Sequence, residues 1–397
     1  MALESLGRWG LALALLTGLT SPAIADDAKS ADPKPATETA KPDPIDWDKA
    51  RALRAREQRG DKLSAEEQAY LDRAKAALRA GERPNAGAGR PAPAGRNAGA
   101  PGEARASTGL VPLSDGGEAK YKNLPLGLYG DGKSDPPAAH LEKALAAAKQ
   151  IVPLDADGKP DAANGRVALL SIGMSNTTQE FSKFVEIANA DARKNPLVTI
   201  VDGAQGGMDA ADWADPQRGP EVWRRAEQRA AALKVTPAQV QVVWIKQAIK
   251  GPQRLGDFPA HADVLQKHLA TIVGLAKQRY PNLKLVYLSS RTYAGWAQSG
   301  LNPEPYAYES AFSVRGLIGQ QVAGDRGLAY GDAPVLLWGP YLWTDGTKGR
   351  AADKVTWEQA DTARDGTHPS DSGRRKVADM LLNFFTTDPT AKGWFLK

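Results

Sequence analysis

The sequence predicts an α/β fold: a three-layer α/β/α domain in which helices cover both faces of a five-stranded parallel sheet. Five short apolar runs are nearly continuous rather than alternating, which is typical of strands buried on both faces. Longer stretches with helical periodicity separate these runs, so each strand is expected to connect to the next through a helix and to lie parallel to it. Both patterns fall within residues 107–397, which we interpret as the folded domain.

The five predicted strands are rich in β-branched and other apolar residues, and they are Arg166–Ile172, Leu197–Asp202, Gln239–Lys246, Leu283–Ser289 and Pro334–Gly339. The six predicted helices repeat apolar residues three and four positions apart, at about Pro137–Gln150, Thr177–Ala190, Gly219–Leu233, His261–Arg279, Tyr306–Gln321 and Ser370–Thr386. We expect strand order 2-1-3-4-5. In such sheets ligands bind at the carboxyl ends of the strands, so the functional residues are sought there.

The composition excludes several classes of function. The 397 residues contain 51 lysines and arginines and 46 acidic residues, and a net charge of +5 is too mild for a protein that mainly binds nucleic acid. The chain has no cysteine, which excludes disulfides, thiolate metal sites and a cysteine nucleophile. Four histidines leave little room for a histidine metal cluster, and nothing in the sequence calls for a metal or another cofactor.

Residues 1–25 have the pattern of a secretory signal peptide. A weakly basic start at Arg8 precedes the apolar run Trp9–Leu19, and an A-x-A cleavage pattern follows at Ala23–Ala25. The apolar run is too short for a permanent membrane span. We therefore expect export to the periplasm or the medium, with no stable membrane insertion after cleavage; the alternative is an uncleaved helix at the membrane surface.

Three further segments separate this signal from the folded domain. Residues 26–45 are polar and proline-rich without apolar periodicity, and are expected to be a disordered linker. Residues 46–83 suggest a short helical hairpin whose second helix opens with a capping box, Ser64-x-x-Glu67. This hairpin is interpreted as a solvated spacer, or alternatively as a docking element for an unknown protein partner. Residues 84–106, rich in Gly, Ala and Pro, form a flexible tether.

Two short motifs imitate ligand sites and fail in context. Gly127–Ser134 matches the spacing of a nucleotide-binding P-loop, but no apolar strand precedes it and Asp135–Pro137 follows it, where proline supplies no amide for phosphate. Asp155–Gly158 is similar to the start of a calcium loop but lacks the later acidic ligand. Both are predicted to be turns.

Polar residues follow the first three predicted strands. The first strand ends in a glycine and leads to Ser175 and Asn176 just before a helix, an arrangement that can project the serine hydroxyl beside the positive end of the helix dipole. The second strand leads to Gly207, whose amide can point at a ligand. The third ends at Lys246 and Gln247, whose side-chain amide can donate to an oxyanion. Taken singly, each is also explained as a cap, a turn or a solvated strand exit.

The loop before the last helix supplies a general base. His368 follows Asp365 by three residues in a glycine-containing loop, and a carboxylate there can fix the tautomer of the imidazole ring. Pro369 keeps the histidine out of the helix, which begins with Ser370 as its cap. Together with Ser175 and two oxyanion donors, this loop completes a set of groups for nucleophilic catalysis.

These blocks resemble the SGNH/GDSL hydrolase family over about Arg166–Phe385. The Gly-x-Ser block at Ser175, the glycine block at Gly207 and the terminal Asp-x-x-His block, Asp365 to His368, carry the resemblance. The family's aspartate before the nucleophile is Met174 here. In addition, the family's third-block asparagine is absent, and Gln247 stands in its region, which puts full hydrolytic competence in question.

The resemblance implies a serine esterase with a flavodoxin-like fold, in which Ser175 is the nucleophile, His368 the base and Asp365 its orienting acid, with Gly207 and Gln247 in the oxyanion hole. Substrate contacts are expected from five residues near the strand ends: Asn176, Lys246, Arg291, Tyr293 and Trp343. Aromatic, polar loops after the fourth and fifth strands suggest an acylated, chiefly acetylated, carbohydrate. The alternatives are a weak or inactive module that binds glycan, and a hydrolase of small lipids or thioesters.

Overall fold

The computed structural model describes residues 45, 49–50, 53, 57, 63–79 and 105–397. The chain divides into two compact units, Met1–Ala94 and Gly95–Lys397. The predicted signal peptide, the 26–45 linker apart from Ile45, and most of the 84–106 tether lie outside the described residues. The predicted segment boundaries therefore remain predictions.

In the first unit, the described helix is α2 (Ala65–Arg79). The predicted capping box is confirmed: the Ser64 amide donates to Glu67 Oε2 at 2.9 Å, and the Glu67 amide donates to Ser64 Oγ at 3.2 Å. Lys75 on α2 forms an ion pair of 2.9 Å with Glu57. The helix thus contacts the segment that precedes it, as a hairpin requires, although most of that segment lies outside the described residues.

The second unit is built on a five-stranded parallel sheet with the order β4-β3-β5-β6-β7. The strands are β3 (Val167–Gly173), β4 (Val198–Val201), β5 (Val240–Lys246), β6 (Leu285–Ser289) and β7 (Val335–Trp338). This is the predicted order 2-1-3-4-5, and each strand lies within two residues of its predicted bounds. Every residue of these five strands except Thr199 is buried, which explains the nearly continuous apolar runs.

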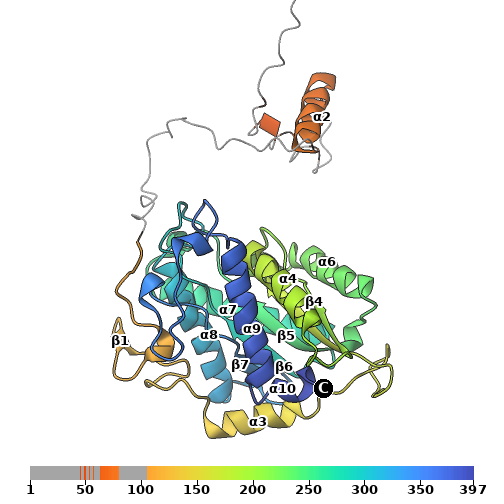
Figure 1. Cartoon of the computed structure of the whole chain (residues 1–397), viewed down its shortest axis with the longest axis vertical. Helices are drawn as coiled ribbons and strands as arrows, with labels where there is room; N and C mark the ends of the chain where they lie inside the picture. Colours follow the sequence, from red (N-terminus) through yellow and green to blue (C-terminus); the bar gives the residue numbers. More distant parts are fainter. Residues whose placement is uncertain (1–44, 46–48, 51–52, 54–56, 58–62, 80–104) are drawn as a thin grey trace, which may run out of the picture. The chain divides into compact units, whose positions relative to one another are not determined.

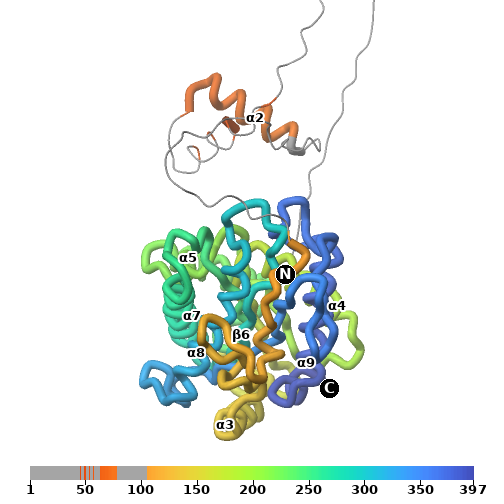
Figure 2. Tube along the Cα trace, turned by 90° about the vertical axis from the view of Figure 1, so that its left-hand side faces the viewer, coloured from red at the N-terminus to blue at the C-terminus, as the bar shows by residue number. Residues whose placement is uncertain are grey.

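Helices cover both faces of this sheet, which confirms the three-layer prediction. The helices are α3 (Ala138–Ala148), α4 (Ser175–Ala190), α5 (Ala210–Ala214), α6 (Gly219–Ala232), α7 (Ala260–Arg279), α8 (Tyr306–Val322), α9 (Asp371–Thr387) and α10 (Lys392–Phe395). Helices α4 and α9 lie together on one face, and α7 and α8 pack against each other on the opposite face (Figures 1 and 2). The two short helices α5 and α10 were not predicted, since a single turn leaves no periodic pattern.

Aromatic packing fixes α4 against both the sheet and α9. Phe181 stacks on Trp244 of β5, with ring centroids 5.3 Å apart, and Phe184 stacks on Phe385 of α9 at 5.4 Å. All four rings are fully buried, and burial of each such side chain contributes roughly 1.5–3 kcal/mol. The start of α4, where the candidate nucleophile Ser175 lies, is therefore held on a rigid element.

The P-loop look-alike is a turn, as predicted. Two-residue strands β1 (Lys120–Tyr121) and β2 (Leu124–Pro125) form a small antiparallel hairpin ahead of it. The Tyr129 amide then donates to the Lys133 carbonyl at 3.0 Å, which closes the glycine-rich segment on itself. Among the described residues, no helix is both long and apolar enough to cross a membrane.

Candidate active site

Ser175, His368 and Asp365 form one line of hydrogen bonds. Ser175 Oγ lies 2.8 Å from His368 Nε2, and His368 Nδ1 lies 2.5 Å from Asp365 Oδ2. The serine belongs to the first turn of α4, and the other two residues belong to the loop before α9. The structure therefore brings together three residues that are up to 193 positions apart in the sequence, in the arrangement of a nucleophile, a base and an orienting acid.

Ser175 is positioned by a sharp passage from β3 into α4. A Cβ at position 173 would lie 2.3–2.4 Å from the side-chain atoms of Thr177, so glycine is required where the first turn of α4 folds back on the strand. Thr177 Oγ1 donates to the Lys246 carbonyl at 2.7 Å, which ties this turn to the end of β5. The helix begins at Ser175 itself, two residues earlier than predicted, and no side chain caps it. Its first amides are thus available to a ligand.

The Asp365–His368 loop is folded by its own backbone. Asp365 Oδ1 accepts the amides of Thr367 and His368, both at 3.0 Å. Gly366 has φ +63°, and a Cβ there would lie 1.7 Å from the Trp296 carbonyl oxygen, so both the conformation and the space demand glycine. Ser370 then accepts the Gly373 amide and caps α9, as predicted. This loop presents the imidazole to Ser175 with its other nitrogen held by the carboxylate.

The same contacts keep Asp365 ionised. Burial raises the pKa of this carboxyl, but the hydrogen bonds from His368 and Thr367 outweigh burial and lower the pKa below its usual value. An ionised Asp365 holds the proton of His368 on Nδ1 and leaves Nε2 free to accept the proton of Ser175. The electrostatics therefore fit the role of an orienting acid.

The triad opens into a cavity of about 290 Å³ at the carboxyl ends of the strands. Five predicted site residues line it: Ser175, His368, Gly207, Asn176 and Arg291. Gly207 has φ +80°, a conformation that favours glycine, and its carbonyl accepts Lys250 Nζ at 2.7 Å. Of the two predicted oxyanion donors, Gly207 lies at the cavity.

Gln247 does not line this cavity. Its side chain is buried, and its Nε2 atom donates to the Met208 carbonyl at 3.4 Å. The side-chain amide that was expected to replace the family's asparagine is therefore engaged inside the protein. The expectation that Gln247 contributes to an oxyanion hole is thus not supported by this geometry.

Three predicted substrate contacts are also buried away from the cavity. Lys246 is 1% exposed and forms an ion pair with Glu180 of α4. Burial lowers the pKa of Lys246 to about 8, although the Glu180 carboxylate opposes the shift. The Tyr293 hydroxyl donates to the Arg105 carbonyl at 2.7 Å. Trp343 is fully buried, and its indole N–H donates to the Glu304 carboxylate at 2.8 Å. Lys246, Tyr293 and Trp343 are corrected to structural roles, because their polar atoms are satisfied inside the protein.

Sequence reasoning missed five residues that line the cavity: Met174, Lys250, Leu301, Asn302 and Thr367. Asn302 donates to the Ile249 carbonyl at 3.2 Å, which joins the loop after β6 to the segment after β5. Lys250 and Asn302 lie beyond strands already predicted to end at the site, and their position after those strands was the available signal. Which residue of a long loop returns to the site depends on tertiary contacts that no local pattern reports.

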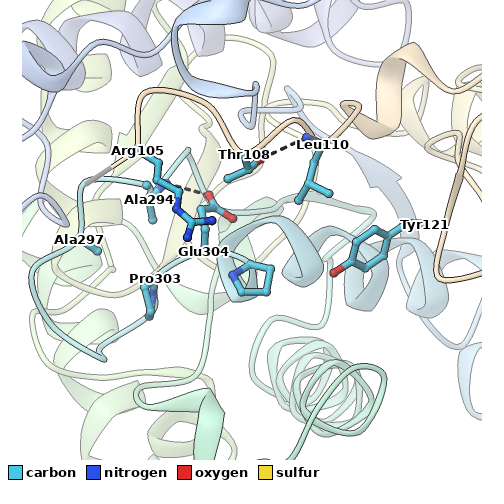
Figure 3. Close-up of a pocket in the computed structure, with 10 residues that line it drawn as sticks. Arg105, Thr108, Leu110, Tyr121, Ala294, Ala297, Pro303 and Glu304 are labelled. Atoms are coloured by element: carbon cyan, nitrogen blue, oxygen red, sulfur yellow. Dashed lines mark hydrogen bonds between the residues drawn. The ribbon is translucent and has the colours of Figure 1, made fainter. Parts of the chain in front are cut away.

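A second, larger cavity of about 420 Å³ is lined by the start of the domain and by the loop after β6 (Figure 3). Its polar side chains are those of Arg105, Thr108, Tyr121 and Glu304. Burial raises the pKa of Glu304 to about 7, against the hydrogen bonds that its carboxylate accepts from Ala294, Trp343 and Tyr308. This cavity contains none of the three triad residues.

Comparison with known proteins assigns no family to the chain. No family model matches it, and no curated protein matches it. Among solved structures, it is similar to the lipase Lip_vut3 from a goat rumen metagenome, with 14% identity and a TM-score of 0.34 over 56% of this chain and 100% of that chain. An Arabidopsis thaliana protein has 11% identity and a TM-score of 0.31 over 52% and 67%. An extracellular lipase from Streptomyces rimosus has 13% identity and a TM-score of 0.30 over 55% and 98%.

Proposed function

We propose that this chain is an exported serine esterase that removes acyl groups, specifically acetyl groups, from carbohydrate. The observation that carries the proposal is the hydrogen-bonded line of Ser175, His368 and Asp365, which opens into a cavity at the carboxyl ends of a parallel sheet. A serine beside a histidine, itself oriented by a carboxylate, is the arrangement that activates a hydroxyl for acyl transfer.

The geometry supports a two-step reaction. His368 Nε2 takes the proton of Ser175 as Oγ attacks the ester carbonyl, and the amides of Ser175 and Gly207 stabilise the resulting oxyanion. The intermediate expels the sugar alcohol, which receives the proton from His368. Water then attacks the acetyl-serine, gives its proton to His368, and the second intermediate releases acetate and returns the proton to Ser175.

The size of the cavity favours a small acyl group over a long lipid chain. Asn176, Arg291 and Asn302 are buried polar residues that line it, beside two large apolar side chains, Met174 and Leu301. A volume of about 290 Å³ is at the lower end of small-molecule sites, which suits an acetyl group better than a long acyl chain. The hydroxyl groups of a sugar can bond to these polar side chains, since a hydroxyl both donates and accepts hydrogen bonds.

The test is hydrolysis of p-nitrophenyl acetate by the purified mature protein, Ser175→Ala and a matched control, Ser182→Ala. Ser182 is exposed on the same helix and does not line the cavity. We expect the control to retain full activity and Ser175→Ala to fall to the uncatalysed rate. A panel of acetylated glycans and a series of acyl chain lengths then test the substrate.

The outcomes separate the alternatives. Equal background rates for all three proteins, together with glycan binding, would favour the non-catalytic module. A preference for chains longer than butyrate would favour the lipid or thioester hydrolase and overturn the acetyl assignment. Export is tested by N-terminal sequencing of the protein recovered outside the cytoplasm, with Asp26 expected as the first residue.

A further inference from the structure

Arg291 is a buried cation whose guanidinium group has an incomplete set of partners. It lies two residues after the end of β6, is 1% exposed, and lines the same cavity as Ser175 and His368. Its Nε and Nη1 atoms are buried, and neither has a hydrogen-bond partner among the residues that the structure describes. Its backbone amide donates to Ser310 Oγ at 3.3 Å. A buried charge whose hydrogen bonds are incomplete is costly, so this group calls for a ligand.

Three carboxylates act on Arg291 from a distance, and each is already engaged. Burial lowers the pKa of Arg291, and the charges of Glu180, Glu304 and Asp365 oppose that shift. Glu180 is paired with Lys246, and Asp365 with His368. The Glu304 carboxylate accepts two backbone amides and an indole N–H, as described above. These groups oppose the fall in the pKa of Arg291, but none of them is hydrogen-bonded to its guanidinium in the described part of the chain.

The cavity wall is positively charged. Of the ten described residues that line it, Arg291 and Lys250 are cationic and none is acidic. The Lys250 ammonium is already bound, at 2.8 Å to the Asp212 carboxylate and at 2.7 Å to the Gly207 carbonyl. Arg291 is therefore the cation of this wall that is left for a substrate.

Two acceptors in the same wall also lack partners. Asn176 Oδ1 and Asn302 Oδ1 are buried and accept no hydrogen bond from any residue in the described part of the chain. Both side chains line the cavity with Arg291. Acceptors of this kind suit the hydroxyl groups of a sugar, whereas the planar guanidinium suits a carboxylate, to which it can donate two parallel hydrogen bonds.

We propose that Arg291 binds a carboxylate of the substrate, so that the natural substrate is an O-acetylated acidic sugar, a uronate, rather than a neutral one. This inference rests on the proposed esterase function and specifies its substrate class. Because Arg291, Ser175 and His368 line one cavity of about 290 Å³, the carboxylate belongs to the acetylated ring or to its immediate neighbour.

The first test is direct binding to the full mature protein, which does not depend on turnover. Calorimetric titration with methyl glucuronide is compared with methyl glucoside and with the neutral amide of the glucuronide. We expect the carboxylate to bind roughly tenfold to a hundredfold more tightly than either neutral sugar, the usual contribution of a hydrogen bond to a charged group. Equal affinities for the three would overturn the inference. A sugar sulfate that binds more tightly than the uronate would overturn the choice of carboxylate.

The second test uses Arg291→Met and Arg291→Lys, with Arg326→Met as a control for the loss of one exposed positive charge. The readout is the ratio of kcat/KM for acetylated methyl glucuronide to that for acetylated methyl glucoside. We expect Arg326→Met to keep the wild-type ratio, Arg291→Met to bring it close to one, and Arg291→Lys to restore part of it.

The failures of the two proposals are distinguishable. If Ser175→Ala abolishes p-nitrophenyl acetate hydrolysis but the wild-type ratio is close to one, the esterase stands and the acidic-sugar inference falls. If no ester is hydrolysed, the esterase falls, and the titrations still decide whether Arg291 recognises a carboxylate. Should Arg291→Met fail to fold, the comparison of uronate with its amide in the wild-type protein decides alone.

Discussion

Replacing Asp365 with asparagine changes one group in the triad while keeping its shape. In the wild-type chain Oδ1 accepts the amides of Thr367 and His368, and Oδ2 lies 2.5 Å from His368 Nδ1. Asparagine keeps the first oxygen and both amide bonds, so the loop is expected to fold. The Nδ2 group then faces the ring as a donor, which forces Nδ1 to become the acceptor and moves the ring proton to Nε2.

The consequence falls on Ser175, 2.8 Å from that nitrogen. With a proton on Nε2, His368 can no longer accept the serine proton, and the dominant tautomer is inactive. Such a swap typically lowers kcat by about 10⁴, which corresponds to roughly 5.5 kcal/mol at 1.36 kcal/mol per tenfold. Stability should change by much less, because two of the three hydrogen bonds to the Asp365 side chain remain.

The assay is kcat and KM for p-nitrophenyl acetate, with a thermal melt for each protein. Asp371→Asn is the matched control, because Asp371 is a neighbouring, exposed carboxylate on the first turn of α9 that does not line the cavity. We expect Asp371→Asn to retain activity and Asp365→Asn to lose about four orders of magnitude with its melt nearly unchanged. A loss below tenfold in a folded Asp365→Asn variant would refute the assigned role of the carboxylate.

Two further predictions concern buried charges. Lys246→Met leaves Glu180 buried without its partner and should cost about 3–5 kcal/mol in urea unfolding, with KM for p-nitrophenyl acetate unchanged; a raised KM in an equally stable protein would restore Lys246 as a substrate contact. Glu304 holds its proton to about pH 7 in the folded chain, so it binds more protons folded than unfolded between about pH 4.5 and 7, and its contribution to stability falls as pH rises through that window. Relative to Glu304→Gln, the wild-type protein should therefore lose up to roughly 3 kcal/mol of unfolding free energy between about pH 4.5 and 8, and parallel profiles would contradict this.

The fold was predictable because its signals are local and repeated. A buried parallel strand needs apolar residues on both faces, and the five runs are separated by helices with a clear period, so their type and order could be inferred. The Asp365–His368 pair was predictable for a related reason: three residues and a glycine suffice to close the contact. Ser175 was found because a glycine and a serine between a strand and a helix are a visible pattern.

The errors concern side chains whose partners are remote in the sequence. Lys246 and Gln247 stand at the end of β5, where a polar pair suggests a ligand, yet Glu180 on α4 holds the lysine inside the protein. Trp343 and Tyr293 lie in loops that suggested a sugar platform, but both are packed into the core. In each case the loop is rich in aromatic and polar residues, but the side chains that were expected to be exposed are buried. Burial depends on which elements cover the loop.

Lys246, which was expected to contact the substrate, also helps to explain why Arg291 lacks hydrogen-bond partners. Glu180 acts electrostatically on both cations but forms its hydrogen bond with Lys246, so the ion pair neutralises one positive charge and leaves the other. Without Lys246, the buried Glu180 carboxylate would lack its ion-pair partner and would act on Arg291 as an uncompensated negative charge. The Lys246–Glu180 pair thus offsets the charge of Glu180, which suits a cavity wall that receives its anion from a substrate.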